Sequence, residues 1–513
     1  MTMPRILRPF VRSREAGWGF TLLLCVPYLA LLVWMHAHHE MWRDEIHFWT
    51  VARLARGFWD LVVGDRIYDG HPPLWYWYLH VLTWFTKSAV GIQIATVAAA
   101  MLAAVLLVRY APFPRYLKVL LLFSYYFGYE YTVLSRNYVL GWTLACLFCA
   151  LYHPIRVRYL GLAVALALLS LSSFYGLVLA LFLLGFFVLD QSRFSFLPAR
   201  GPAPAEFAIF TSPRSLVTLA VAMAGIAFCV LTISPPDPNP FSPAFVFDSI
   251  KLTALPDMAF RFVAGVLPWR EFSRDTFWAM SPTFWAATSS WLPYVGSGLL
   301  LCALLALYPS WRLMLGYFAA VVCMDLFQQA RHMGEPRHWG HYFMGFVVAC
   351  WLLRTTFPRR SHWLSTLLLT GLCALHVQAF VVATVIDTRH PFSGGRETAA
   401  FIEQAGLQDL PLVAGPDYNA STVAGYLRRP FYAAETDEVN QTVVFHARRR
   451  AFSAADLMSR AIQVARERKS PVVLVASYPL PAPPPGVTRQ HLFTSQIGTV
   501  RDETFDVYKL TVE

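Results

Sequence analysis

Two adjacent carboxylates directly after the first long apolar stretch are the residues of this sequence best suited to chemistry. Asp44 and Glu45 follow Trp42 and Arg43 at the edge of a strongly hydrophobic run. Carboxylates beside a membrane are costly and usually functional. Either could act as a general base toward a hydroxyl or amine, with Arg43 and the bilayer edge tuning its pKa. Alternatively, the pair caps the following helix, since acidic groups favour a helix N-terminus, and one residue can do both.

A histidine before two prolines forms a second candidate site, in the sequence His71-Pro72-Pro73-Leu74. His71 could bind a phosphate or a metal, or it could cap the turn. Asp65 and Asp69 lie nearby, so Asp69 and His71 are candidate ligands for a divalent cation such as Mg²⁺ or Mn²⁺. Chemistry with a phosphate leaving group often recruits such an ion. The sequence indicates no other cofactor.

Arg136 forms a third candidate, in the sequence Ser135-Arg136-Asn137-Tyr138. Its planar guanidinium suits a phosphate because it donates two parallel hydrogen bonds. The alternative is an arginine that extends toward lipid headgroups.

A fourth cluster lies between two later apolar stretches and contains Arg331, Arg337, His338 and His341. Positive residues are depleted on the outer face of a membrane protein. Their presence here therefore indicates an anionic ligand.

The elements that carry these residues are membrane helices, because 56% of the residues are hydrophobic and only 14% are charged. This composition predicts a polytopic α-helical membrane protein. About eleven apolar segments are predicted to span. They are Trp18–Met35, Val90–Val108, Leu117–Tyr131, Val139–Leu151, Tyr159–Phe174, Gly176–Leu189, Leu216–Ile233, Trp291–Leu307, Leu313–Gln328, His341–Leu353 and Trp363–Ile386.

Positive charge sets the predicted topology. Arg5, Arg8, Arg12 and Arg14 precede the first span, and arginines recur in alternate connectors. This pattern predicts a cytoplasmic N-terminus and puts all four candidate sites on the outer face. Within residues 1–386, we expect two outer-face loops, 36–73 and 234–290. The first should hold an amphipathic surface helix with Ile46, Trp49, Ala52, Leu54 and Phe58 on its apolar face, followed by a second interfacial helix over Pro73–Phe85.

The composition changes near Asp387, and residues 387–513 have the character of a soluble domain. Helical periodicity covers Arg396–Ala405 and Ala454–Arg468, whereas Pro411–Ala414, Pro471–Ser477 and Thr504–Val512 are typical of strands. We expect a small α/β domain on the outer, periplasmic face.

The net charge of +11 does not indicate a nucleic-acid partner, because it lies largely in the short connectors between spans. No nucleotide-binding glycine loop and no zinc-protease motif occurs in the sequence. The lipid bilayer is the expected partner. The abundance of arginine over lysine is typical of bacterial proteins from GC-rich genomes.

The order of these motifs resembles the GT-C glycosyltransferases, and within them the family 39 group. That group includes protein O-mannosyltransferases and the aminoarabinose transferases of lipid A. The resemblance is carried by Asp44-Glu45, His71-Pro72-Pro73-Leu74 and Arg136-Asn137-Tyr138, within the first third of the chain.

The resemblance implies a transfer of sugar from a polyprenyl-phosphate donor to a glycan, lipid or protein, with inversion, at the bacterial cytoplasmic membrane. It makes Asp44 the base and gives Glu45 a part in acceptor placement. The implied donor-phosphate site is His71, Arg136, Tyr138, Arg337 and His338, with Arg43, Arg331 and His341 as possible additions.

Two other functions remain open from the sequence. A transporter of an anionic substrate could use Asp44, Arg136 and Arg337 as a relay, although transporters usually place such charges near mid-membrane on broken helices. A lipid-linked polysaccharide ligase or polymerase would also use outer-face arginines, but it need not use the acidic pair.

Overall fold

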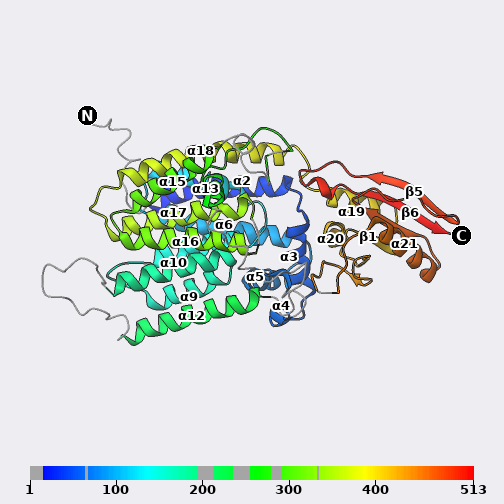
Figure 1. Cartoon of the computed structure of the whole chain (residues 1–513), viewed down its shortest axis with the longest axis horizontal. Helices are drawn as coiled ribbons and strands as arrows, with labels where there is room; N and C mark the ends of the chain where they lie inside the picture. Colours follow the sequence, from blue (N-terminus) through cyan, green and yellow to red (C-terminus); the bar gives the residue numbers. More distant parts are fainter. Residues whose placement is uncertain are drawn as a thin grey trace.

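A computed structural model describes residues 16–63, 68–192, 212–234, 255–275, 277–278, 290–331, 334–446 and 448–513. A helical bundle forms one end of the molecule, and a domain built on a β-sheet forms the other (Figure 1). Asp65, the four N-terminal arginines and much of the predicted loop 234–290 lie outside the described residues.

Helices occupy each of the segments predicted to span the membrane. They are α2 (Trp18–His38), α6 (Val90–Tyr110), α7 (Arg115–Leu122) with the π-helix η2 (Tyr126–Glu130), α8 (Tyr138–Leu151), α9 (Tyr159–Ser170), α10 (Phe174–Gln191), α12 (Pro213–Ile233), α15 (Leu292–Leu307), α16 (Trp311–Ala330), α17 (Pro336–Thr356) and α18 (Trp363–Asp387). Among the described residues, six of these helices are long and apolar enough to cross a membrane. The chain is a polytopic α-helical membrane protein.

The third predicted span is not one continuous helix, which corrects the expectation for Leu117–Tyr131. Helix α7 ends at Leu122, and the Tyr131 N–H then bonds to the Tyr126 carbonyl, five residues back, at 2.9 Å. Tight packing accompanies this change: a side chain at Gly128 would meet the Phe380 ring of α18 at 2.8 Å.

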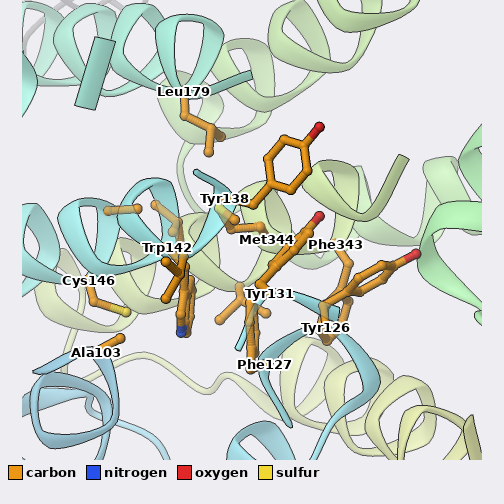
Figure 2. Packing of buried hydrophobic residues seen from close by; sticks show 14 of the residues in the cluster. Ala103, Tyr126, Phe127, Tyr131, Tyr138, Trp142, Cys146, Leu179, Phe343 and Met344 are labelled. Carbon is orange, nitrogen blue, oxygen red and sulfur yellow. The ribbon is translucent and has the colours of Figure 1, made fainter. Parts of the chain in front are cut away.

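An aromatic layer surrounds this π-helix (Figure 2). Phe127 stacks on Trp142 with ring centroids 3.6 Å apart, and Tyr126 stacks on Tyr131 at 5.2 Å. All four side chains are buried. This layer fixes the backbone that leads from η2 to Arg136.

The first outer loop contains the two surface helices that the sequence predicts, together with a short one between them. These are α3 (Arg43–Leu54), α4 (Asp60–Val63) and α5 (Leu74–Leu82). Ile46, Trp49 and Ala52 of α3 are buried as expected, whereas Leu54 and Phe58 are exposed. In Figure 1 these helices lie at the end of the bundle that faces the sheet domain. In the second outer loop, α13 (Leu255–Val266) packs against α15 and α17.

The C-terminal domain has a six-stranded sheet in the order β3-β2-β1-β4-β6-β5. Its strands are β1 (Leu412–Gly415), β2 (Phe431–Tyr432), β3 (Val439–Asn440), β4 (Val472–Ala476), β5 (Val487–Thr494) and β6 (Asp506–Val512). β1 pairs in parallel with β2 and β4, while β3, β6 and β5 add antiparallel edges.

Helices cover both faces of this sheet because successive strand residues point to opposite sides. Leu412 and Ala414 pack with α19 (Gly395–Gln404) and α20 (Asp417–Leu427), whereas Val413 packs with α21 (Ala454–Arg468). The sequence predicted α19, α21, β1, β4 and β6 but missed α20, β2, β3 and β5. The helix α20 matters most, since it packs on α3 of the first outer loop. A side chain at Gly425 would meet Ile46 at 2.1 Å, so only glycine permits this approach.

Candidate active site

Asp44 lies in the first turn of α3, at the end of the bundle that faces the C-terminal domain. The helix starts there because the Glu45 carboxylate accepts the Trp42 backbone N–H at 3.2 Å, which satisfies a free donor of the first turn. One oxygen of Asp44 accepts a hydrogen bond from the Arg136 guanidinium and lies 3.9 Å from Nη2 of Arg337. The structure thus brings together three candidates from three distant parts of the sequence.

The two guanidinium groups share an aromatic support. They lie 6.0 Å (Arg136) and 5.5 Å (Arg337) from the centroid of the Trp42 indole. Arg337 also donates to Glu335. The side chains of Arg136 and Arg337 are 7% and 10% exposed. The Nε of each arginine is buried without a hydrogen-bond partner in the described part of the chain. Neither guanidinium therefore uses all of its donors within the described part of the chain.

These cations decide the charge of Asp44. Burial alone would raise the pKa of its carboxyl, but Arg136, Arg337, Arg43 and His47 outweigh burial and lower it below its usual 3.8. Asp44 is therefore an ionised carboxylate at neutral pH, with 29% of its side chain exposed.

Asp44 opens on a cavity of 390 Å³ between α3, the segment from Tyr68 to His71, and the C-terminal domain. His71 lines this cavity with its ring 5.2 Å from that of Phe48. Burial and the nearby Arg136 lower the pKa of His71 to about 3, so its imidazole is neutral. Tyr418, Ser421, Val443 and Phe445 form the wall contributed by the C-terminal domain.

His47 is a cavity residue that the sequence reasoning missed. Its Nε2 lies 3.0 Å from Asp69, and its Nδ1 lies 2.6 Å from the Thr442 hydroxyl of the C-terminal domain. Burial lowers the pKa of His47, but the Asp69 carboxylate outweighs burial and raises it above 6.5. Its position three residues after Asp44 could have indicated that both side chains lie on the same face of the helix.

The cation site suggested by Asp69 and His71 finds little support in these contacts. Oδ2 of Asp69 is already engaged by His47 at 3.0 Å and by the Tyr76 hydroxyl at 2.6 Å. Among the described residues, no three His, Cys, Asp or Glu side chains form a group that could hold a metal ion. Asp65, the other suggested ligand, is not among them.

Glu45 points away from the cavity. Its side chain is fully buried, accepts the Ser135 N–H at 2.5 Å and lies 3.0 Å from Nε2 of His39. Nδ1 of His39 lies 2.9 Å from Asp387, the last residue of α18. Burial alone would lower the pKa of His39, but the two carboxylates raise it well above 6.5. The Glu45 carboxylate therefore joins α3 to the bundle, and no surface is left on it for an acceptor.

Arg43 faces the C-terminal domain. Its Nη1 donates to Asn419 at 2.7 Å and to Asp502 at 2.8 Å, and its backbone N–H donates to Glu503 at 3.0 Å. Arg43 thus fixes the C-terminal domain on the first turn of α3.

Three aromatic candidates lie in the protein interior and do not face the cavity. Tyr138 lies under Arg136, at 5.5 Å from the guanidinium to the ring, and His338 and His341 stack on Tyr175. All three are buried and do not line the cavity. Arg331 also lies outside the cavity lining, beside Gly70, where an added Cβ would be 3.0 Å from its guanidinium.

Comparison with known proteins gives few matches. No protein-family model and no curated protein matches the chain. Two solved structures of ArnT from Cupriavidus metallidurans are similar over 96% of this chain and 98% of theirs. The form bound to undecaprenyl phosphate has 15% identity and a TM-score of 0.47, and the apo form has 14% and 0.41. At this level of similarity, the function has to be argued from the residues of the chain itself.

Proposed function

We propose that this protein transfers a sugar from a polyprenyl-phosphate donor to a glycan, lipid or protein acceptor at the outer face of the bacterial cytoplasmic membrane. One observation carries the proposal. An ionised carboxylate, Asp44, faces a cavity at one end of a membrane-helix bundle, in contact with Arg136 and close to Arg337. The motif order that resembles the GT-C glycosyltransferases agrees with it.

The arginines suit the phosphate of such a donor. The Arg136 guanidinium lines the cavity, Nη2 of Arg337 lies 3.9 Å from the same Asp44 oxygen, and charge-assisted bonds to phosphate are the strong ones. The adjoining helices are apolar enough to let a prenyl chain lie in the bilayer while its phosphate reaches the cavity. The neutral imidazole of His71, in the same cavity, can donate one further hydrogen bond.

Asp44 then serves as the general base. It takes the proton of the acceptor hydroxyl or amine as that atom bonds to the anomeric carbon. The bond from this carbon to the phosphate oxygen breaks, and the electron pair leaves with the polyprenyl phosphate. Attack from the face opposite the leaving group inverts the anomeric centre. Arg136 and Arg337 stabilise the charge that builds up on the phosphate.

The same arginines couple donor binding to the strength of the base. In the free protein, they hold the pKa of Asp44 below its usual value. A bound phosphate competes for these guanidinium groups and weakens their effect on Asp44. The carboxylate therefore becomes more basic when the donor is present. Asp44 then accepts a proton readily only when the donor is bound.

A transfer assay with purified protein and a panel of polyprenyl-phosphate sugars tests the proposal. Asp44→Asn should reduce turnover by about 10²- to 10⁴-fold, the usual contribution of a general base. Asp60→Asn is the matched control, because Asp60 lies in the same outer loop, paired with an exposed arginine, and should retain activity. Unchanged turnover in Asp44→Asn would remove the base, and no product from any donor in wild type would remove the proposed reaction.

A further inference from the structure

A second cavity, of 870 Å³, lies in the seam between α2 and α6 and shares no lining residue with the cavity at Asp44. Its wall includes Leu29 and Val33 of α2 and Val90 and Ile94 of α6. These four side chains are between 38% and 55% exposed, although they lie on helices apolar enough to span a membrane. The cavity is therefore open to the lipid side of the bundle.

The length of this groove matches one leaflet of a bilayer. On α2 it extends from Leu29 to the neighbourhood of His38, where the helix ends, and on α6 from Val90 to Met101. At a rise of 1.5 Å per residue, these stretches are about 14 to 17 Å long. That is half of a hydrocarbon core about 30 Å thick.

The C-terminal domain supplies a basic mouth to the groove. Arg396 of α19 and Arg428, which ends α20, both line it, together with the single carboxylate of Glu403. Neither arginine forms an ion pair within 4 Å of another described residue, and Glu40, which Arg396 influences, has its pKa raised to about 7 by burial. Burial and the nearby Arg428 lower the pKa of Arg53, so Arg53 adds further positive charge close to Arg428. The apolar groove, about as long as one leaflet is thick, thus ends at a site with more arginine than carboxylate side chains.

We propose that this groove binds an anionic phospholipid of the outer leaflet, with an acyl chain along α2 and α6 and its phosphate on Arg396 and Arg428. The charge at the mouth favours an anionic over a zwitterionic headgroup. Because the groove is lined by both the bundle and the C-terminal domain, the lipid joins these two parts of the chain. The site is independent of the transferase proposal, since it uses none of the residues at Asp44.

Native mass spectrometry of the purified protein tests the site. The protein is exchanged into equal mixtures of phosphatidylglycerol and phosphatidylcholine, and the retained lipid is counted. We expect one tightly retained phosphatidylglycerol, preferred roughly 10- to 30-fold, because each arginine near an anionic lipid contributes about a factor of five. Arg396→Ala/Arg428→Ala should abolish this preference, whereas Arg466→Ala/Arg489→Ala, at an exposed and a half-exposed position of the same domain, should keep it.

Filling the groove gives a second readout that does not depend on charge. Ala98 is exposed and lines the groove, so Ala98→Trp should expel the retained lipid, whereas Ala224→Trp, on the exposed face of α12, should not. Equal retention of both lipids by wild type, or unchanged retention in both groove variants, would overturn the proposal. Displacement of phosphatidylglycerol by added undecaprenyl phosphate would also overturn it, by assigning the groove to the donor.

Discussion

Asp44 and Glu45 are neighbours in the first turn of α3, yet their surroundings differ in every respect. Asp44 is 29% exposed, faces a cavity and meets the guanidinium groups of Arg136 and Arg337. Glu45 is fully buried between His39 and the Ser135 N–H. Successive residues of an α-helix point about 100° apart. A single step along α3 therefore separates the cavity from the core.

The difference teaches what each carboxylate is able to do. The partners of Asp44 are cations that a phosphate ligand can also engage, so its charge and basicity can change during a reaction. The partners of Glu45 are closed off from solvent, and His39 is itself held by Asp387. A carboxylate in the surroundings of Glu45 stabilises the structure, whereas a carboxylate in the surroundings of Asp44 can take part in chemistry.

The strongest challenge to this comparison is Glu45→Gln. Hydrogen bonds to charged groups contribute about 1.5 to 3 kcal/mol, and Glu45→Gln weakens those to His39 and to the Ser135 N–H, while Asp387 still compensates the His39 charge. We expect Glu45→Gln to lower the free energy of unfolding by about that much while the folded molecules keep their turnover. Asp44→Asn should instead keep the free energy of unfolding of wild type and lose turnover. Chemical unfolding in detergent measures the free energy of unfolding of each variant, and a transfer assay normalised to folded protein measures its turnover. If the two variants lose the same amount of stability and the same amount of turnover, the two carboxylates do not have different roles.

A smaller effect is expected for the two arginines beside Asp44. Arg136→Ala and Arg337→Ala each remove charge-assisted hydrogen bonds to phosphate, so affinity for a polyprenyl phosphate should fall roughly 10- to 100-fold. Arg331→Ala is the matched control, because Arg331 is not among the charged groups that act on Asp44. Equilibrium binding of a labelled polyprenyl phosphate measures the change. If all three variants bind alike, the phosphate lies elsewhere.

The smallest effect is on the pH profile. Asp44 must be ionised to act as a base, and Arg337 contributes to lowering its pKa. Removing that cation in Arg337→Ala therefore raises the pKa of Asp44, and the acid limb of kcat/KM should move to higher pH. The pH profile of kcat/KM for Arg331→Ala should coincide with that of wild type. An unmoved acid limb in Arg337→Ala would indicate that Asp44 does not set it.

Much of this molecule could be predicted from local patterns. Apolar runs gave the membrane helices, and periodicity gave α3, α19 and α21. Asp44, His71, Arg136 and Arg337 were selected because charged groups beside a membrane are costly, and three of these four line one cavity.

The remaining features depend on contacts that no local pattern contains. The burial of Glu45 requires His39 and Asp387, whose contact spans 348 residues. The role of Arg43 depends on α20, a helix with many small residues and little apolar periodicity. Phe445 reaches the cavity, and Thr442 reaches His47, only because the C-terminal domain docks on α3. Sequence spacing cannot reveal such docking, since it depends on the shape of two assembled surfaces.

The hydrogen bond from the Arg43 backbone to Glu503 has a consequence for how the protein is made. It closes a loop of 460 residues, so the first turn of α3 cannot gain this partner until Glu503 has been synthesised. At about 5 to 20 residues per second, the ribosome needs roughly 25 to 90 seconds to cover that distance. During that interval α3 lies at the membrane surface without its C-terminal cover. The wall that the C-terminal domain contributes to the cavity is thus added well after α3 is made, and loss of Glu503 would remove one of the bonds that hold that domain on α3.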